Sequence, residues 1–82
     1  MSAMNESEIY TRLTSVFHDV FDDDSLVVTP ELSAKDVDGW DSITHIRLLL
    51  TVERAFKLKF STIEISKLEN VGSLVTLIAA HT

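Results

Sequence analysis

The residue with the clearest chemical potential in this sequence is Ser42, which follows Asp41 and precedes His45 by three positions. A serine beside an imidazole base is the pairing that serine hydrolases use for nucleophilic catalysis. One common form of such sites exposes the serine on a strained turn of the type G-x-S-x-G, and no such turn surrounds Ser42. The short chain also lacks the additional segments that would supply an oxyanion hole. We therefore expect no catalytic residues, and we expect His45 to be a packing or surface residue.

Two other roles are open to Ser42. A Ser or Asp at the start of a helix is most often an N-cap that accepts a backbone N–H bond, and the Asp41-Ser42 pair fits that role. A hydroxyl at the positive end of a helix is also well placed to carry a phosphate group, which the helix dipole and the free N–H groups stabilise. The pair by itself does not decide between these roles.

Clusters of acidic residues raise the question of a calcium site. Counting from Asp22, the fifth and twelfth positions are Leu26 and Ser33, and neither is an EF-hand ligand. Counting from Asp36, the corresponding positions are Trp40 and Arg47, which fail in the same way. The acidic run is therefore interpreted as a solvated loop, and no metal ligands are predicted.

Length and cysteine content limit the function classes further. A chain of 82 residues buries a small interior, and little of it remains for an enclosed active site once a core is packed. The chain has no cysteine, which excludes disulfides and thiolate metal sites and suits a reducing cytoplasm. We therefore expect a monomeric, cytoplasmic protein that is not an enzyme.

The charge of the chain is acidic and unevenly distributed. The net charge is −6, which disfavours binding to nucleic acid or to anionic membrane surfaces. Residues 1–41 hold ten acidic and two basic residues, whereas residues 42–82 hold three acidic and five basic ones. The acidic N-terminus does not resemble a signal peptide, and no apolar run reaches the roughly 18 residues of a membrane span.

Apolar residues recur at helical spacing in four segments. The pattern predicts a helix over about 6–21 with Asn5 and Glu8 as the capping pair at its start, and a second helix over about 42–57. It also predicts a short helix from the capping box at Ser61 and Glu64 to about Leu68, and a last helix capped by Asn70. Residues 22–41 contain the only proline and form a long loop, whose apolar residues are expected to bury in part. The predicted fold is all-α, a small four-helix bundle with three longer helices and one short one, in a single domain over 1–82.

The second predicted helix carries two apolar stripes. One lasts to the end of the helix and is assigned to the core; it consists of Leu48, Leu49, Val52, Ala55 and Phe56. The other consists of Ile43, Ile46 and Leu50, and it continues into charged residues one turn later. Either the loop covers this half-length stripe, or the stripe is an exposed patch beside Ser42 that other proteins contact.

The segment Gly39-Trp40-Asp41-Ser42-Ile43 resembles the phosphopantetheine attachment site of acyl carrier proteins. The resemblance extends over nearly the whole chain, including helix lengths and several residues at familiar positions, namely Glu53, Phe56, Phe60, Lys67, Leu68 and Val71. In that family a serine, here Ser42, receives 4′-phosphopantetheine from coenzyme A. The terminal thiol of this arm holds acyl groups as thioesters, and the preceding aspartate, here Asp41, helps hold the magnesium ion of the transferase that installs the arm.

The resemblance implies a carrier protein without catalysis of its own. Its expected partners are a phosphopantetheinyl transferase and the enzymes that load and accept the acyl group, in fatty-acid, polyketide or other specialised lipid or metabolite synthesis. A peptidyl or D-alanyl carrier would use the same serine, and a helical interaction module would never be modified. These alternatives stay open at the level of sequence.

One departure from typical fatty-acid carriers concerns charge. Their second helix is acidic, whereas residues 42–60 here hold one acidic residue, Glu53, against four basic ones, Arg47, Arg54, Lys57 and Lys59. The run 40–47 resembles discrete carriers of specialised pathways. We therefore expect a partner-binding face formed by Ile43, Ile46, Arg47, Leu50 and Arg54, and partner enzymes that present acidic residues to it.

Overall fold

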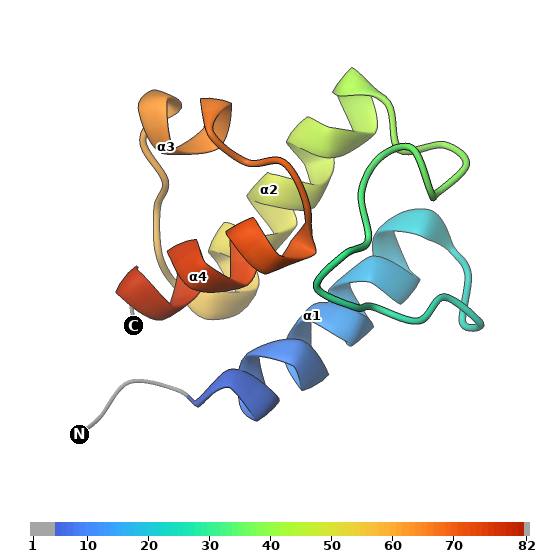
Figure 1. Ribbon diagram of the computed structural model, residues 1–82, viewed down its shortest axis with the longest axis horizontal. Helices are drawn as coiled ribbons and strands as arrows, with labels where there is room; N and C mark the ends of the chain where they lie inside the picture. The colour runs from blue at the N-terminus through green and yellow to red at the C-terminus, as the bar shows by residue number, and fades with distance from the viewer. Residues whose placement is uncertain (1–4, 82) are drawn as a thin grey trace.

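The computed structural model describes residues 5–81, and within that range it contains four α-helices and no strand. The helices are α1 (Glu6–Phe21), α2 (Ser42–Phe56), α3 (Thr62–Ser66) and α4 (Val71–His81). α1 packs against both α2 and α4, and the short α3 lies at the other side of α4 (Figure 1). This arrangement confirms the predicted all-α fold with three longer helices, one short helix and a long first loop.

The helix starts follow from local sequence. Asn5 accepts a hydrogen bond of 2.8 Å from the backbone N–H of Glu8, and Ser61 makes the same contact with Glu64 at 3.1 Å, so capping boxes begin α1 and α3. Asn70 accepts from the backbone N–H of Ser73 at 2.9 Å in the first turn of α4. All three caps were predicted from sequence, because each joins residues three positions apart.

Two helix ends differ slightly from the predicted bounds. α2 ends at Phe56, and Lys57 is its C-cap, with a left-handed φ of 56°. α3 ends at Ser66, two residues before the predicted end at Leu68. The left-handed residue breaks the helical repeat of α2, and α1 ends in the same way at Asp22, with a φ of 52°. The C-cap of α3, Lys67, has a right-handed conformation instead.

The core is formed by the apolar faces of α1, α2 and α4 together with Phe60. From α2 it takes Leu48, Leu49, Val52 and Phe56, which confirms the full-length stripe as the core face. Ala55 was assigned to the same stripe, but it is exposed. It lies at the edge of the stripe in the last turn of α2, where a methyl side chain extends too little to be covered.

The long loop between α1 and α2 crosses the bundle and is attached to α4. The backbone N–H groups of Val71 and Gly72 donate to the carbonyls of Leu32 and Pro30, each at 2.9 Å, which satisfies N–H groups that a helix start leaves free. Leu26, Val28 and Leu32 pack against the core, as expected for a loop that is partly buried, whereas Val27 is exposed. The loop is therefore a fixed part of the fold, visible on the right of Figure 1.

An aromatic group joins the end of α1 to the start of α2. The ring of Phe17 lies 5.6 Å from that of Phe21 and 5.5 Å from that of Trp40, and Trp40 is 5.8 Å from Phe21. The contact between Phe17 and Trp40 is edge-to-face, with an interplanar angle of 81°, and such contacts favour a defined ring orientation. They position Trp40 two residues before Ser42.

The prediction that the N-terminus is not a signal peptide concerns residues that lie partly outside the described range. Both ends of the predicted domain 1–82 also lie outside it. None of the described helices is both long and apolar enough to span a bilayer.

Candidate functional site

Ser42 is the first residue of α2 and is exposed. The N-cap of α2 is Asp41, whose carboxylate accepts the backbone N–H of Thr44 at 2.9 Å. No hydrogen bond to the Ser42 hydroxyl is found within residues 5–81. Because Asp41 performs the capping role, the hydroxyl of Ser42 is left accessible at the positive end of the helix.

The carboxylate of Asp41 is held in its charged form. Its hydrogen bonds to the backbone N–H and the side chain of Thr44 lower its pKa below the usual range of aspartate. A negative charge therefore lies next to the Ser42 hydroxyl at neutral pH. A single carboxylate is not a metal site, and no group of three or more His, Asp or Glu side chains within residues 5–81 is arranged to hold a metal ion.

A cavity of about 310 Å³ opens beside Ser42. It lies between α2, the preceding loop and the segment that joins α3 to α4. Its lining residues are Ala34, Trp40, Asp41, Ser42, His45, Leu48, Leu68, Glu69, Asn70 and Leu74. The site therefore combines an accessible hydroxyl with a neighbouring space that has both apolar and polar walls.

His45 takes part in this wall through a contact that the sequence did not predict. The indole N–H of Trp40 donates to Nδ1 of His45 at 3.0 Å, and the two rings are stacked with centroids 6.1 Å apart. Ser42 has no hydrogen bond to His45 among the described residues, so these two side chains do not form a nucleophile and base pair. The expectation of a packing role for His45 holds, with Trp40 as its partner.

Comparison with known proteins decides the family. No protein-family model matches the chain. The solution NMR structure of holo acyl carrier protein from Geobacter metallireducens is similar to it, with 48% sequence identity and a TM-score of 0.80, over 84% of this chain and 79% of that one. The chain belongs to the acyl carrier protein family. Acyl carrier proteins hold acyl groups for other enzymes and catalyse no reaction themselves, so this carrier is not an enzyme.

The half-length apolar stripe on α2 of this acyl carrier protein is exposed to solvent. The exposed fractions of Ile43, Ile46 and Leu50 are 73%, 59% and 54%, so the loop does not cover them. Arg47 and Arg54 are exposed on the same helix. The structure therefore favours the exposed patch over the covered one, and it brings together all five residues of the expected partner-binding face on one helix.

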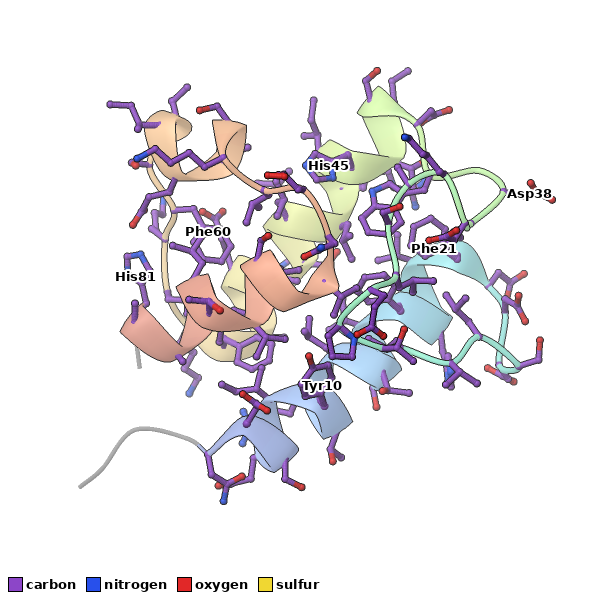
Figure 2. All side chains as sticks on the ribbon, viewed as in Figure 1. Tyr10, Phe21, Asp38, His45, Phe60 and His81 are labelled. Atoms are coloured by element: carbon purple, nitrogen blue, oxygen red, sulfur yellow. The ribbon has the colours of Figure 1, made fainter. Side chains whose placement is uncertain are left out.

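The other two histidines of the carrier make structural contacts. His18 lies 2.8 Å from the carbonyl of Leu26 and connects α1 to the loop. His81 lies 2.9 Å from the carboxylate of Glu64. Its ring also makes an edge-to-face contact with the ring of Phe60, and Figure 2 shows both rings. Both contacts lie away from Ser42 and assist the packing of the loop and of α4.

The capping role of Asp41 predicts a pH dependence of stability. Because its pKa is lower in the folded chain than in the unfolded one, the cap stabilises the fold above about pH 3.9, and this contribution is lost as the pH falls through the lowered value. Asp41→Asn keeps a capping oxygen that does not titrate. We expect its melting temperature to fall less than that of the wild type between about pH 7 and about pH 3, as measured by circular dichroism. Equal falls would contradict this role.

Proposed function

We propose that this acyl carrier protein carries 4′-phosphopantetheine on Ser42 and shuttles acyl thioesters between enzymes of a specialised lipid or polyketide pathway. The observation that supports the attachment site is the accessible hydroxyl of Ser42, which makes no capping bond and lies beside a cavity. Intact mass spectrometry after incubation with coenzyme A, Mg²⁺ and a phosphopantetheinyl transferase tests the proposal.

The residues around Ser42 fit a phosphodiester. The hydroxyl lies at the N-terminal end of α2, a helix of 15 residues whose dipole favours an anion there. Asp41 presents its charged carboxylate next to the hydroxyl, where it would share the magnesium ion that the transferase uses. The cavity beside Ser42 offers a sheltered space for the distal part of the arm or its cargo.

The covalent step is a phosphoryl transfer to the side chain of Ser42. Its Oγ forms a bond to the phosphorus that bears the pantetheine group, the pyrophosphate bond of coenzyme A breaks, and adenosine 3′,5′-bisphosphate leaves. The hydroxyl proton passes to a base of the transferase. The bound group supplies a terminal thiol for thioester chemistry, in a chain that has no cysteine of its own.

The partners of this carrier are a phosphopantetheinyl transferase and the enzymes that load and accept its acyl group. We assign their docking to the open face of α2, because three exposed aliphatic residues, Ile43, Ile46 and Leu50, follow directly after Ser42. Arg47 and Arg54 make this face basic, and a basic face attracts acidic partner surfaces. This charge supports a specialised pathway. The resemblance implies that fatty-acid enzymes present basic docking surfaces, which a basic face would repel.

The contiguous core supports a single carrier domain.

Charge reversal on the docking face is expected to slow partner binding. The double variant Arg47→Glu and Arg54→Glu should associate more slowly with the enzyme that loads this carrier, because charges at the rim of an interface steer encounter. The effect should be largest at low salt, since exposed charges are screened within about 10 Å at 0.1 M ionic strength. Stopped-flow association rates at two salt concentrations measure it.

The matched control is Arg12→Glu with Lys35→Glu, which makes the same change in net charge at exposed positions on α1 and the loop. Its association rate should stay nearer to that of the wild type. If both double variants slow binding equally, net charge and not the face of α2 controls docking. If the Arg47 and Arg54 variant binds faster, the acidic loop at 22–24 becomes the better candidate surface.

A further inference from the structure

The hydrogen bond between Trp40 and His45 determines which imidazole nitrogen carries the proton. An indole N–H can only donate, so Nδ1 of His45, at 3.0 Å, must accept. An imidazole that accepts at Nδ1 is neutral and is protonated at Nε2. His45 therefore has an N–H donor on the side of the ring away from Trp40.

The donor that remains at Nε2 has no partner among the described residues. His45 is half-buried and forms part of the cavity wall beside Ser42. Figure 2 shows its ring on α2 near the segment that joins α3 to α4. A polar group that loses part of its hydration without a protein partner favours a ligand acceptor.

Trp40 holds this donor in a defined orientation. Its ring contacts those of Phe17 and Phe21, and the imidazole to which its N–H donates lies nearly parallel to it, at an interplanar angle of 26°. These contacts restrict the indole, and the indole in turn restricts the imidazole. Trp40 is thus a positioning residue that acts through His45.

The rest of the cavity wall indicates what the donor would bind. Leu48, Leu68 and Leu74 supply apolar surface, and Asp41 and Glu69 supply carboxylates. The described lining contains no lysine or arginine. A carboxylate on the cargo, inside the cavity and away from the N-terminus of α2, would be repelled by these side chains, whereas an uncharged oxygen would meet a neutral donor.

Asn70 also lines this cavity, and its side-chain amide can provide a second neutral donor. Its side-chain oxygen accepts from the backbone N–H of Ser73 at 2.9 Å and from the Ser73 hydroxyl at 3.0 Å, so the amide NH₂ is turned away from these contacts. A backbone N–H can only donate, so the atom that it contacts must be the amide oxygen of Asn70. The NH₂ group of Asn70 is then free to donate elsewhere, as Nε2 of His45 is. Both donors suit an uncharged oxygen.

We propose that His45, held by Trp40 in its Nε2-protonated form, donates a hydrogen bond to an uncharged oxygen of the group attached at Ser42. The proposal rests on the attachment of that group to Ser42. The oxygen is either an amide carbonyl of the arm or a hydroxyl or keto oxygen of the acyl cargo. His45 thereby makes the cavity selective for oxygenated, uncharged cargo when the acceptor belongs to the cargo.

The first test is NMR of the histidine side chains of ¹⁵N-labelled protein. Four states are compared: the unmodified chain, the chain with the arm alone, and chains loaded with a saturated acyl group or with a 3-hydroxyacyl group of equal length. In the unmodified state His45 should show an unprotonated Nδ1 and a protonated Nε2. A hydrogen bond to the ligand should then change the NMR chemical shifts of Nε2 and its proton. The change should appear with the arm alone if the acceptor is in the arm, or only with the 3-hydroxyacyl group if the acceptor is in the cargo.

Variants separate this role from packing. His45→Gln keeps an acceptor for Trp40 and a donor for the ligand, whereas His45→Phe keeps ring bulk without either. Cleavage of the loaded thioester by hydroxylamine should be about twofold to tenfold faster in His45→Phe than in the wild type, the factor expected of one hydrogen bond, and His45→Gln should restore protection. Trp40→Phe should keep its helical content while the ¹⁵N shifts of His45 move towards a mixture of tautomers.

The outcomes are distinguishable. If no mass is added at Ser42, the attachment proposal fails and this inference fails with it. If mass is added but the Nε2 signal of His45 is the same in all four states, only the role of His45 is wrong. A protonated Nδ1 in the unmodified chain, or equal cleavage rates for wild type and His45→Phe, would also overturn it.

Discussion

Replacing Ser42 with Ala is expected to abolish the mass increase that incubation with coenzyme A, Mg²⁺ and a phosphopantetheinyl transferase produces in the wild type. The reason is chemical, because the methyl group of Ala has no oxygen to form the phosphodiester. The fold should persist, since Asp41 and not Ser42 caps α2. An exposed substitution of this kind changes the free energy of unfolding by at most about 0.5 kcal/mol. Intact mass spectrometry and thermal circular dichroism measure the two effects.

Ser61 provides a matched control within the same chain. It is also an exposed serine at a helix start, but its hydroxyl caps α3. Ser61→Ala should therefore lower the melting temperature and leave the modification complete, the reverse of the Ser42→Ala result. Asp41→Asn should keep the fold and slow the transfer, because the amide is a poorer magnesium ligand than the carboxylate. Modification that persists in Ser42→Ala would disprove the assignment.

Truncation of Phe17 is expected to be the most destabilising single change. Phe17 is fully buried and contacts the rings of both Phe21 and Trp40, so Phe17→Ala removes a ring that few neighbours can replace. Such truncations cost about 3–5 kcal/mol. A chain of this size holds about 4–12 kcal/mol in total, so the variant should lose from about a quarter of its stability to all of it. Urea denaturation, followed by the fluorescence of Trp40, measures the loss.

Phe21→Ala is the control for the loss of an aromatic ring as such. Phe21 belongs to the same aromatic group on α1 but is only half-buried, so its truncation should cost less. A midpoint for Phe17→Ala near that of the wild type would show that the aromatic group contributes little. Because Trp40 adjoins the site, partial loss of its packing should also disturb the NMR signals of His45.

The sequence predicted the parts of this carrier that depend on neighbours along the chain. The capping bonds of Asn5, Ser61 and Asn70 join residues three apart, and the core stripe of α2 follows the helical repeat. The motif around Ser42, on which the proposed attachment site rests, is likewise a short run of residues at a helix start. Local geometry determines each of these features, so they could be predicted before the fold was known.

The tertiary structure decided what depends on segments far apart in the chain. Whether Ile43, Ile46 and Leu50 were covered depended on the path of the loop. That path is fixed by the backbone N–H groups at the start of α4, which donate to the carbonyls of Leu32 and Pro30. The tautomer of His45 depended on where the aromatic group of α1 held Trp40, a contact outside any helical spacing. Periodicity describes only which face of one helix is apolar. Long-range packing decides what covers an apolar helix face and which nitrogen of His45 is left to donate.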